Sequence, residues 1–456
     1  MRRTAFLVIL VSLLVIAAAC GGGEEATPAP TLTGAAPTGT IPTTAQTTGE
    51  ASFELLDYNV YIDESGDLII AGIIENTGDA ASRPDYDALQ LVDAGGEVVA
   101  TPYPTTLELI APGQKSPLIA EIYEHEGVPQ NWQELDVILQ EEGYPADLIF
   151  DVYITLDPEG LASEAFESDT EGQPDLFGVS GWIINNGDYP IARPTVFVAG
   201  YDAQGKLIDV DSSYPAPDYL DPGMNMPFTS SLSMVETITN YEVFAEGEAV
   251  GARDLVDLEV AYYSMVGPDK YGRTHFLGEV VNQGSELAVE TEIIMALVSE
   301  QEVVVDIDYV HSSSISLNPG DSLPFMLTST PCPARQEMWD EPVFMVQGFT
   351  EDSMSNTHVA VYSDIEVEGM DSLYKPYTTL PGFASEGQVT NTGQAEADIG
   401  IIGAIYDAEG KVVDVAYAYG LMFVGPGETE DVELRFSLAE EAADFKVFYG
   451  ALTNRY

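Results

Sequence analysis

Short apolar runs separated by turn residues occur along most of the chain. Near the C-terminus, Ala384–Asn391 (ASEGQVTN) leads into Thr-Gly, and the strongly apolar run Ile399–Tyr406 (IGIIGAIY) follows. Asp407–Gly410 (DAEG) comes next, and Lys411–Tyr419 (KVVDVAYAY) resumes β-branched and aromatic residues. Two β-branched runs joined by Asp-x-x-Gly predict a β-hairpin.

The same order of elements recurs roughly every 100 residues, which is enough chain for a complete small domain. Its marker is Gly-x-[Ile/Val]-x-Asn-x-Gly, found at Gly72–Gly78, Gly181–Gly187, Gly278–Gly284 and Gly387–Gly393. Each marker is followed by a turn residue at Asp93, Asp202, Ser299 or Asp407, and then by Pro-Gly at Pro112, Pro222, Pro319 or Pro426. We interpret the chain as four tandem copies of one module, each with its own core.

The predicted fold is all-β, with each module an immunoglobulin-like β-sandwich. The last strand of each module is predicted at Leu135–Gln140, Tyr241–Ala245, Val343–Gly348 and Lys446–Leu452. The Asn-x-Gly element is expected to form a tight turn, because Asn and Gly tolerate positive φ. A short helix at Ala439–Asp444 is the main expected exception.

The hairpin region resembles the FxLYD domain, a bacterial surface module named for a Phe-x-Leu-Tyr-Asp core. Ile405-Tyr406-Asp407 of the fourth copy and Tyr201-Asp202 of the second carry the resemblance. The first copy has Leu89-x-Leu91-Val92-Asp93, and the third has Met295-x-Leu297-Val298-Ser299, so both lack the Tyr. The resemblance covers about half of the chain. It implies a sandwich fold on a bacterial lipoprotein and implies no particular chemistry.

The N-terminus predicts export. Arg2-Arg3 precede an apolar run from Ala5 to Ile16, which ends in Ala-Ala-Ala-Cys20. Such a segment is too short to span a bilayer comfortably and is typical of a signal peptide. Its end resembles a bacterial lipobox, although Ala17 stands where Leu is usual. The resemblance implies that Cys20 is acylated and anchors the protein to the cell membrane; an ordinary secretory peptide with an incidental Cys is the alternative.

A disordered stalk is predicted after the anchor, because the segment is rich in Gly, Thr, Ala and Pro and holds no aromatic residue. Short joints between the modules favour a jointed rod over independently tumbling domains. The expected boundaries are a signal peptide at 1–19, the stalk at 20–50, and modules at 51–142, 143–251, 252–352 and 353–456.

The acidic composition limits the classes of partner that the chain can bind. With 76 acidic and 15 basic residues, the chain lacks the basic clusters that nucleic acid binding needs. Solubility explains the acidity most simply, and divalent cation binding is the alternative. A loop at 157–175 contains Glu167-Ser-Asp169-Thr-Glu171-Gly172, which resembles the start of a Ca²⁺ loop. Gly178 stands where such a loop needs a bidentate Glu, so no metal site is predicted.

No catalytic or cofactor site is predicted, and we expect the protein not to be an enzyme. The pairs Asp209/Asp211 and Asp306/Asp308 could in principle do acid–base work, but i, i+2 spacing in strands is typical of a solvated face. Cys332 has no disulfide partner if Cys20 is acylated, so it is expected to be a small buried or loop residue, with a reactive thiol as the alternative.

Tyrosines recur before each Pro-Gly, at Tyr103, Tyr214, Tyr219, Tyr309, Tyr417 and Tyr419. They either pack on the sandwich or form a partner-binding edge, since Tyr is enriched at interfaces. Tyr214 and Tyr219 are the best candidates for such an edge, because Pro215 and Pro217 keep that stretch out of a central strand.

The sequence therefore predicts a non-catalytic cell-surface lipoprotein for binding, adhesion or envelope interaction. Its partners would be the membrane, through Cys20, and an unknown protein or glycan. The alternative is a ligand-capture lipoprotein that serves a transporter or sensing system.

Overall fold

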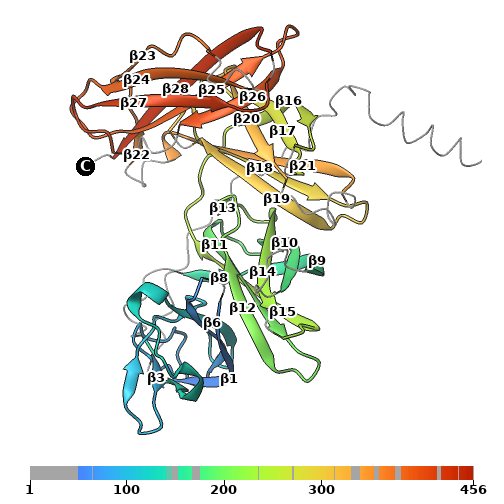
Figure 1. Cartoon of the computed structure of the whole chain (residues 1–456), viewed down its shortest axis with the longest axis vertical. Helices are drawn as coiled ribbons and strands as arrows, with labels where there is room; N and C mark the ends of the chain where they lie inside the picture. The colour runs from blue at the N-terminus through green and yellow to red at the C-terminus, as the bar shows by residue number, and fades with distance from the viewer. Residues whose placement is uncertain are drawn as a thin grey trace, which may run out of the picture.

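The structure is a computed structural model. It describes residues 50–63, 65–140, 143–144, 152–166, 175–234, 236–269, 272–312, 314–329, 339–353, 359–374, 382–418, 423–439 and 441–454. These residues form antiparallel strands, with the short 3-10 helices η1 (Glu124–Glu126) and η2 (Trp132–Glu134), which confirms the all-β class. Figure 1 shows an elongated molecule in which four groups of strands follow one another from blue to red.

Each group of strands is one module. Module 1 contains β1 (Phe53–Ile62), β2 (Leu68–Asn76), β3 (Leu89–Val92), β4 (Val98–Ala100), β5 (Thr105–Thr106), β6 (Lys115–Ile122) and β7 (Asp136–Leu139). Module 2 contains β8 (Tyr153–Thr155), β9 (Asp157–Phe166), β10 (Asp175–Ile184), β11 (Ile191–Tyr201), β12 (Leu207–Ser213), β13 (Tyr219–Leu220), β14 (Asn225–Met234) and β15 (Asn240–Ala249). Module 3 contains β16 (Leu258–Val266), β17 (His275–Asn282), β18 (Ala288–Val298), β19 (Val304–Ser312), β20 (Ser322–Thr328) and β21 (Glu341–Thr350). Module 4 contains β22 (Val359–Val361), β23 (Ile365–Glu368), β24 (Phe383–Asn391), β25 (Asp398–Tyr406), β26 (Val412–Ala418), β27 (Thr429–Phe436) and β28 (Asp444–Asn454).

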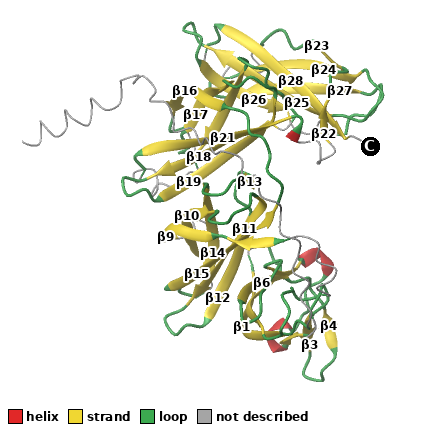
Figure 2. Cartoon of the chain, turned by 180° about the vertical axis from the view of Figure 1, so that it is seen from behind, coloured by secondary structure: helices red, strands yellow, loops and turns green. Residues whose placement is uncertain are grey.

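Every module is built from two sheets. One carries the Asn-x-Gly marker on its central strand, and we call it the motif sheet: β1-β2-β6, β9-β10-β14, β16-β17-β20 and β23-β24-β27. The other contains the hairpin around the Asp-x-x-Gly turn, and we call it the hairpin sheet: β4-β3-β7, β12-β11-β15, β19-β18-β21 and β26-β25-β28. Seen from behind in Figure 2, strands make up the body of each module and loops connect them at the ends.

The marker Asn is buried and its side chain closes the expected turn, but without the positive φ that the sequence predicted. In module 2, Asn185 is 0% exposed, and its Nδ2 donates to the carbonyls of Tyr189 and Leu220 at 2.9 Å each. Its Oδ1 accepts the amide of Gly187 at 3.0 Å. The same three contacts recur at Asn76, Asn282 and Asn391. The second marker Gly does not adopt positive φ in any copy.

Glycine is required in the turns instead. The Pro-Gly turns place Gly113, Gly223, Gly320 and Gly427 at φ between 74° and 83°. In the hairpin turns, Asp93 Oδ1 accepts the amides of Gly95 and Glu97. Asp202 and Asp407 bind their turns in the same way, and Ser299 does so with its hydroxyl.

Two expectations differ from the structure, namely one module boundary and one helix. Tyr144 donates its amide to Arg83 O at 2.7 Å, and Gly143 bridges to Pro84, so these residues belong to module 1 rather than module 2. The predicted helix at 439–444 is wrong, because its described residues are not helical and Asp444 begins β28. The amide of Ala439 donates to the Asp414 carboxylate, which draws the segment across the sandwich.

Candidate functional site

The most informative sites in the molecule are the three joints between modules. At each joint the hairpin sheet of one module packs against the motif sheet of the module before it (Figure 1). The residue that begins the second hairpin strand takes part each time: Leu207, Val304 or Val412. The three joints are therefore copies of one interface.

Joint 1–2 combines apolar packing with hydrogen bonds. The amide of Leu207 donates to Asp57 Oδ2 at 2.9 Å, and Asn59 Nδ2 donates to Ile208 O at 2.7 Å. The Tyr61 hydroxyl donates to Asp209 Oδ1 at 2.6 Å. Burial raises the pKa of Asp209 to about 7, although the hydrogen bond from Tyr61 opposes this shift.

Joint 2–3 uses side chains of the central strand β10, whereas joint 1–2 uses those of the edge strand β1. The Ser180 hydroxyl donates to Val304 O at 2.6 Å, and Trp182 Nε1 donates to Glu302 O at 3.3 Å. Gln347 Nε2 donates to Tyr219 O at 3.0 Å, and the Tyr219 ring packs edge-on against Phe349.

Joint 3–4 is closed by tyrosines from both sides. The amide of Val412 donates to the Tyr262 hydroxyl at 3.0 Å, and the amide of Met326 donates to the Tyr417 hydroxyl at 2.9 Å. The Tyr406 hydroxyl donates to Glu279 Oε1 at 3.0 Å. Burial raises the pKa of Tyr406, so it remains a hydrogen-bond donor at neutral pH.

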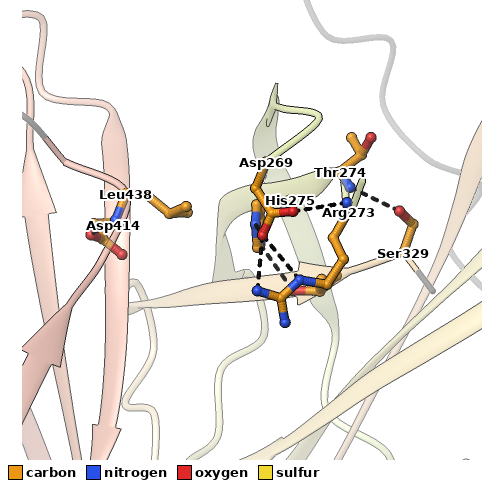
Figure 3. A network of polar contacts seen from close by, with 8 residues as sticks. Asp269, Arg273, Thr274, His275, Ser329, Asp414 and Leu438 are labelled. Atoms are coloured by element: carbon orange, nitrogen blue, oxygen red, sulfur yellow. Dashed lines mark hydrogen bonds and ion pairs between the residues drawn. The ribbon is translucent and has the colours of Figure 1, made fainter. Parts of the chain in front are cut away.

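A polar network lies beside joint 3–4 (Figure 3). Arg273 donates to Asp269 Oδ2 through Nε and Nη2, at 3.0 and 2.8 Å, and His275 Nε2 lies 3.3 Å from the same oxygen. His275 Nδ1 lies 3.1 Å from Thr328 Oγ1. A histidine between a carboxylate and a hydroxyl is the arrangement found in a catalytic triad. Here the histidine is only 5% exposed, and Arg273 neutralises the charge of the carboxylate. We interpret the network as a clamp on the β16–β17 turn.

Asp414 of module 4 faces this network across the joint (Figure 3). Its Oδ2 accepts the amides of Leu438 and Ala439 at 2.6 and 2.9 Å. Its Oδ1 is buried and accepts no hydrogen bond from the described residues. Burial raises the pKa of Asp414, and the hydrogen bonds from the amides of Ala439 and Leu438 oppose this shift.

The large buried clusters extend across two of the joints, and two small clusters cross joint 2–3. Leu207 and Phe197 of module 2 belong to the same buried cluster as Leu68 of module 1. Ile402 and Val412 of module 4 likewise join the buried cluster of module 3. Modules 2 and 4 also contain buried clusters made only of their own residues, so the joints add shared apolar packing between neighbouring modules.

The carboxylate pairs considered for acid–base chemistry are not on solvated faces. Asp209 and Asp306 are 3% and 6% exposed. Asp209 accepts the amide of Ser233 at 2.7 Å, and Asp211 accepts that of Ser231 at 2.9 Å. Both amides lie on β14, an edge strand of the motif sheet, so the carboxylates satisfy donors that an edge leaves unpaired. In module 3, Asp308 binds the amide of Thr328 in the same way.

The two tyrosines proposed for partner binding lie in different environments. Tyr219 is 0% exposed, donates to Asp221 Oδ1 at 2.8 Å and accepts the amide of Arg253 at 3.0 Å. It is part of joint 2–3, which makes it inaccessible to an external partner. Tyr214 is 69% exposed, so the structure does not bring the pair together on one surface.

The other recurring tyrosines also differ in exposure. Tyr103 and Tyr309 are 49% and 55% exposed, whereas Tyr417 is half-buried in joint 3–4. Tyr103 stacks on Tyr86 with ring centroids 5.1 Å apart. Cys20, the loop at Glu167–Gly172, Cys332 and Tyr419 lie outside the described residues.

The two ends of the array differ from the joints. Val98 of module 1 occupies the place of Leu207 and Val412 and is 49% exposed, whereas they are 0% and 1% exposed. At the other end, the motif sheet of module 4 presents Glu386 and Gln388 to solvent. Their counterparts in module 1, Ala71 and Ile73, are 0% and 4% exposed. A polar outer face is typical of a repeat that ends an array.

Two further features of the described residues bear on function. No group of three or more His, Cys, Asp or Glu side chains in that part of the chain could hold a metal ion. Within the same part, we find no helix of the length and apolar character that crossing a membrane requires.

Comparisons with known proteins add no relative. No protein-family model matches the chain, and no curated protein matches it.

Proposed function

We propose that this protein is a bacterial cell-surface lipoprotein whose four-module array acts in binding, adhesion or envelope interaction. The observation that carries the proposal is the threefold repetition of one packed joint, which joins the modules into a single extended unit. An extended, packed array suits a protein that holds a contact surface away from a membrane. The resemblance of the hairpins to FxLYD domains and the lipobox-like run before Cys20 support the location.

The anchor is tested by Cys20→Ser. We expect this variant to lose acylation and to leave the membrane fraction, because a thiol is the group that receives the lipid. Mass spectrometry of the mature N-terminus and cell fractionation would show both effects. Wild-type protein whose mature N-terminus lies elsewhere and carries no lipid would contradict the anchor.

Binding is tested with the full chain on a glycan array and on purified envelope fragments. We expect Tyr214→Ala to reduce specific binding about tenfold with an unchanged melting curve, because exposed aromatic side chains contribute strongly to interfaces. Tyr309→Ala is the matched control, since Tyr309 is also exposed but belongs to another module. Equal binding by wild type and Tyr214→Ala would remove Tyr214 from the contact surface. Tight binding of a small solute instead would favour ligand capture.

A further inference from the structure

Joints 1–2 and 2–3 each bury a glutamate at the same cross-strand pair of the hairpin sheet. In module 2 the pair is Thr195 and Glu246, and in module 3 it is Glu292 and Gln347. Glu246 and Glu292 are 5% and 6% exposed. In joint 1–2, the loop before Pro-Gly of module 1 donates the amide of Glu108 to Glu246. In joint 2–3, Asp218 of the equivalent loop of module 2 acts on Glu292.

Glu246 lies against the loop of module 1. The amide of Glu108 donates to Glu246 Oε1 at 2.5 Å, and the Glu108 carboxylate is itself bound to Arg83 Nη1 at 2.8 Å. Burial raises the pKa of Glu246 to about 8, and the charge of Glu108 adds to the shift. Hydrogen bonds from the backbone of Glu108 and Leu109 lower the pKa of Glu246, but by less than burial raises it. The other charged residues close to Glu246 along its own sheet are Arg193 and Glu248.

Glu292 has an equivalent environment in joint 2–3. Burial raises the pKa of Glu292 to about 8, and Asp218 of module 2 and Glu290 of its own strand add to the shift. His311 Nε2 lies 3.8 Å from Glu292 Oε1, but burial lowers the pKa of His311, so the ring is not a cation at neutral pH. Arg253 acts on Glu290 rather than on Glu292.

We propose that Glu246 and Glu292 link the docking of modules 1 to 2 and 2 to 3 to proton uptake, so that the array is stiffer in acid than in alkaline surroundings. When a joint opens, its glutamate meets water and titrates near its ordinary pKa, about 4.3. When the joint closes, an ionised carboxylate would be desolvated beside a second acidic residue, which favours the protonated form.

The direction of the pH effect follows from the number of protons that the closed and the open joint bind. The folded pKa lies above the open value, so the closed joint binds more protons between these two pKa values. Docking is therefore strongest at pH values below the pKa that the glutamate has in the open joint. It weakens as the pH rises toward about 8, the pKa of the glutamate in the closed joint. Each glutamate changes the docking equilibrium by up to about tenfold per pH unit in that window. This coupling does not depend on lipid anchoring or on a binding partner.

The test is hydrogen exchange of the full chain between pH 5.5 and 8.5, corrected for the intrinsic exchange rate. Joint 1–2 is read at the amides of Glu108 and Leu207, whose hydrogen bonds cross that joint. Joint 2–3 is read at the amide of Arg253, whose hydrogen bond to the Tyr219 hydroxyl crosses that joint. In the wild type, opening of each joint is expected to increase by up to about tenfold per pH unit.

The variants assign the effect to each joint. Glu246→Gln should weaken the pH response of joint 1–2, where Asp209 also titrates with a raised pKa, and should leave joint 2–3 unchanged. Glu292→Gln should remove the response of joint 2–3 and leave that of joint 1–2 unchanged. Glu97→Gln removes the same charge at an exposed place and should keep both responses. Wild-type exchange that does not change with pH would overturn the proposal. So would a response that Glu97→Gln removes as effectively, since general charge repulsion would then explain it.

Discussion

Asn185→Ala is expected to destabilise module 2 by roughly 4 kcal/mol, since it removes three buried hydrogen bonds and each buried group left unpaired costs about 1–3 kcal/mol. The carbonyls of Tyr189 and Leu220 lose their donor, and the amide of Gly187 loses its acceptor. Asn185 is 0% exposed, so water cannot replace these contacts without disrupting the core. Chemical denaturation of the full chain should show an early transition that is absent from the wild type.

The neighbouring residue provides the control. Asn186 lies in the same marker, but its side chain is exposed and donates to Asp157 Oδ2 at 2.8 Å. Asn186→Ala should change stability by no more than about 0.5 kcal/mol, as is usual for surface substitutions. Asn185→Asp should be at least as destabilising as Asn185→Ala, because both carbonyls would then face an acceptor. Similar losses at positions 185 and 186 would show that the buried contacts do not matter.

Much of the fold could be predicted because its signals are local. The turn at Asp407 is identified by an Asp, a Gly and two β-branched runs, and the Asp carboxylate binds the turn amides. The marker Asn was predicted as a turn residue, but its burial and its carbonyl partners were not predicted. Its two carbonyl partners include one far along the chain, such as Leu220 for Asn185, and no local pattern identifies that partner.

The joints were missed, although the sequence holds a signal for them. A strand with one solvated face alternates apolar and polar residues, whereas a strand covered on both faces is apolar throughout. The marker strand of module 1, Leu68–Asn76 (LIIAGIIEN), is apolar almost without interruption, because module 2 covers its outer face. The corresponding strand of module 4, Phe383–Asn391 (FASEGQVTN), has polar residues on that face. Comparing the copies position by position would have located both the joints and the end of the array.

The buried carboxylates could not be predicted in the same way. Asp209 has the spacing of a solvated residue in its strand, and its burial depends on module 1 and on β14. Glu246 is covered by a loop that lies more than a module away in the sequence. Single-sequence patterns report which face a residue is on, but not what covers that face.

Val412→Asp is expected to open joint 3–4, with a loss of about 4 kcal/mol or more, because an unpaired carboxylate would replace a buried side chain. Val412 is 1% exposed and belongs to the buried cluster that modules 3 and 4 share. Opening the joint would also expose Ile402 and Ala404 of the same cluster. We expect a lower melting temperature, a larger radius of gyration by X-ray scattering, and faster hydrogen exchange at the Val412 position.

Val98→Asp is the matched control, because it makes the same chemical change at the equivalent place in module 1. Val98 is 49% exposed, and no module among the described residues covers it, so its substitution should change stability by about 0.5 kcal/mol or less. The difference between the two variants therefore measures the packing of a joint, separated from the intrinsic effect of Asp on the hairpin. Equal losses would show that the hairpin itself is sensitive and that the joint contributes little. A large loss for Val412→Asp with an unchanged radius of gyration would place the damage inside module 4 and contradict the shared core.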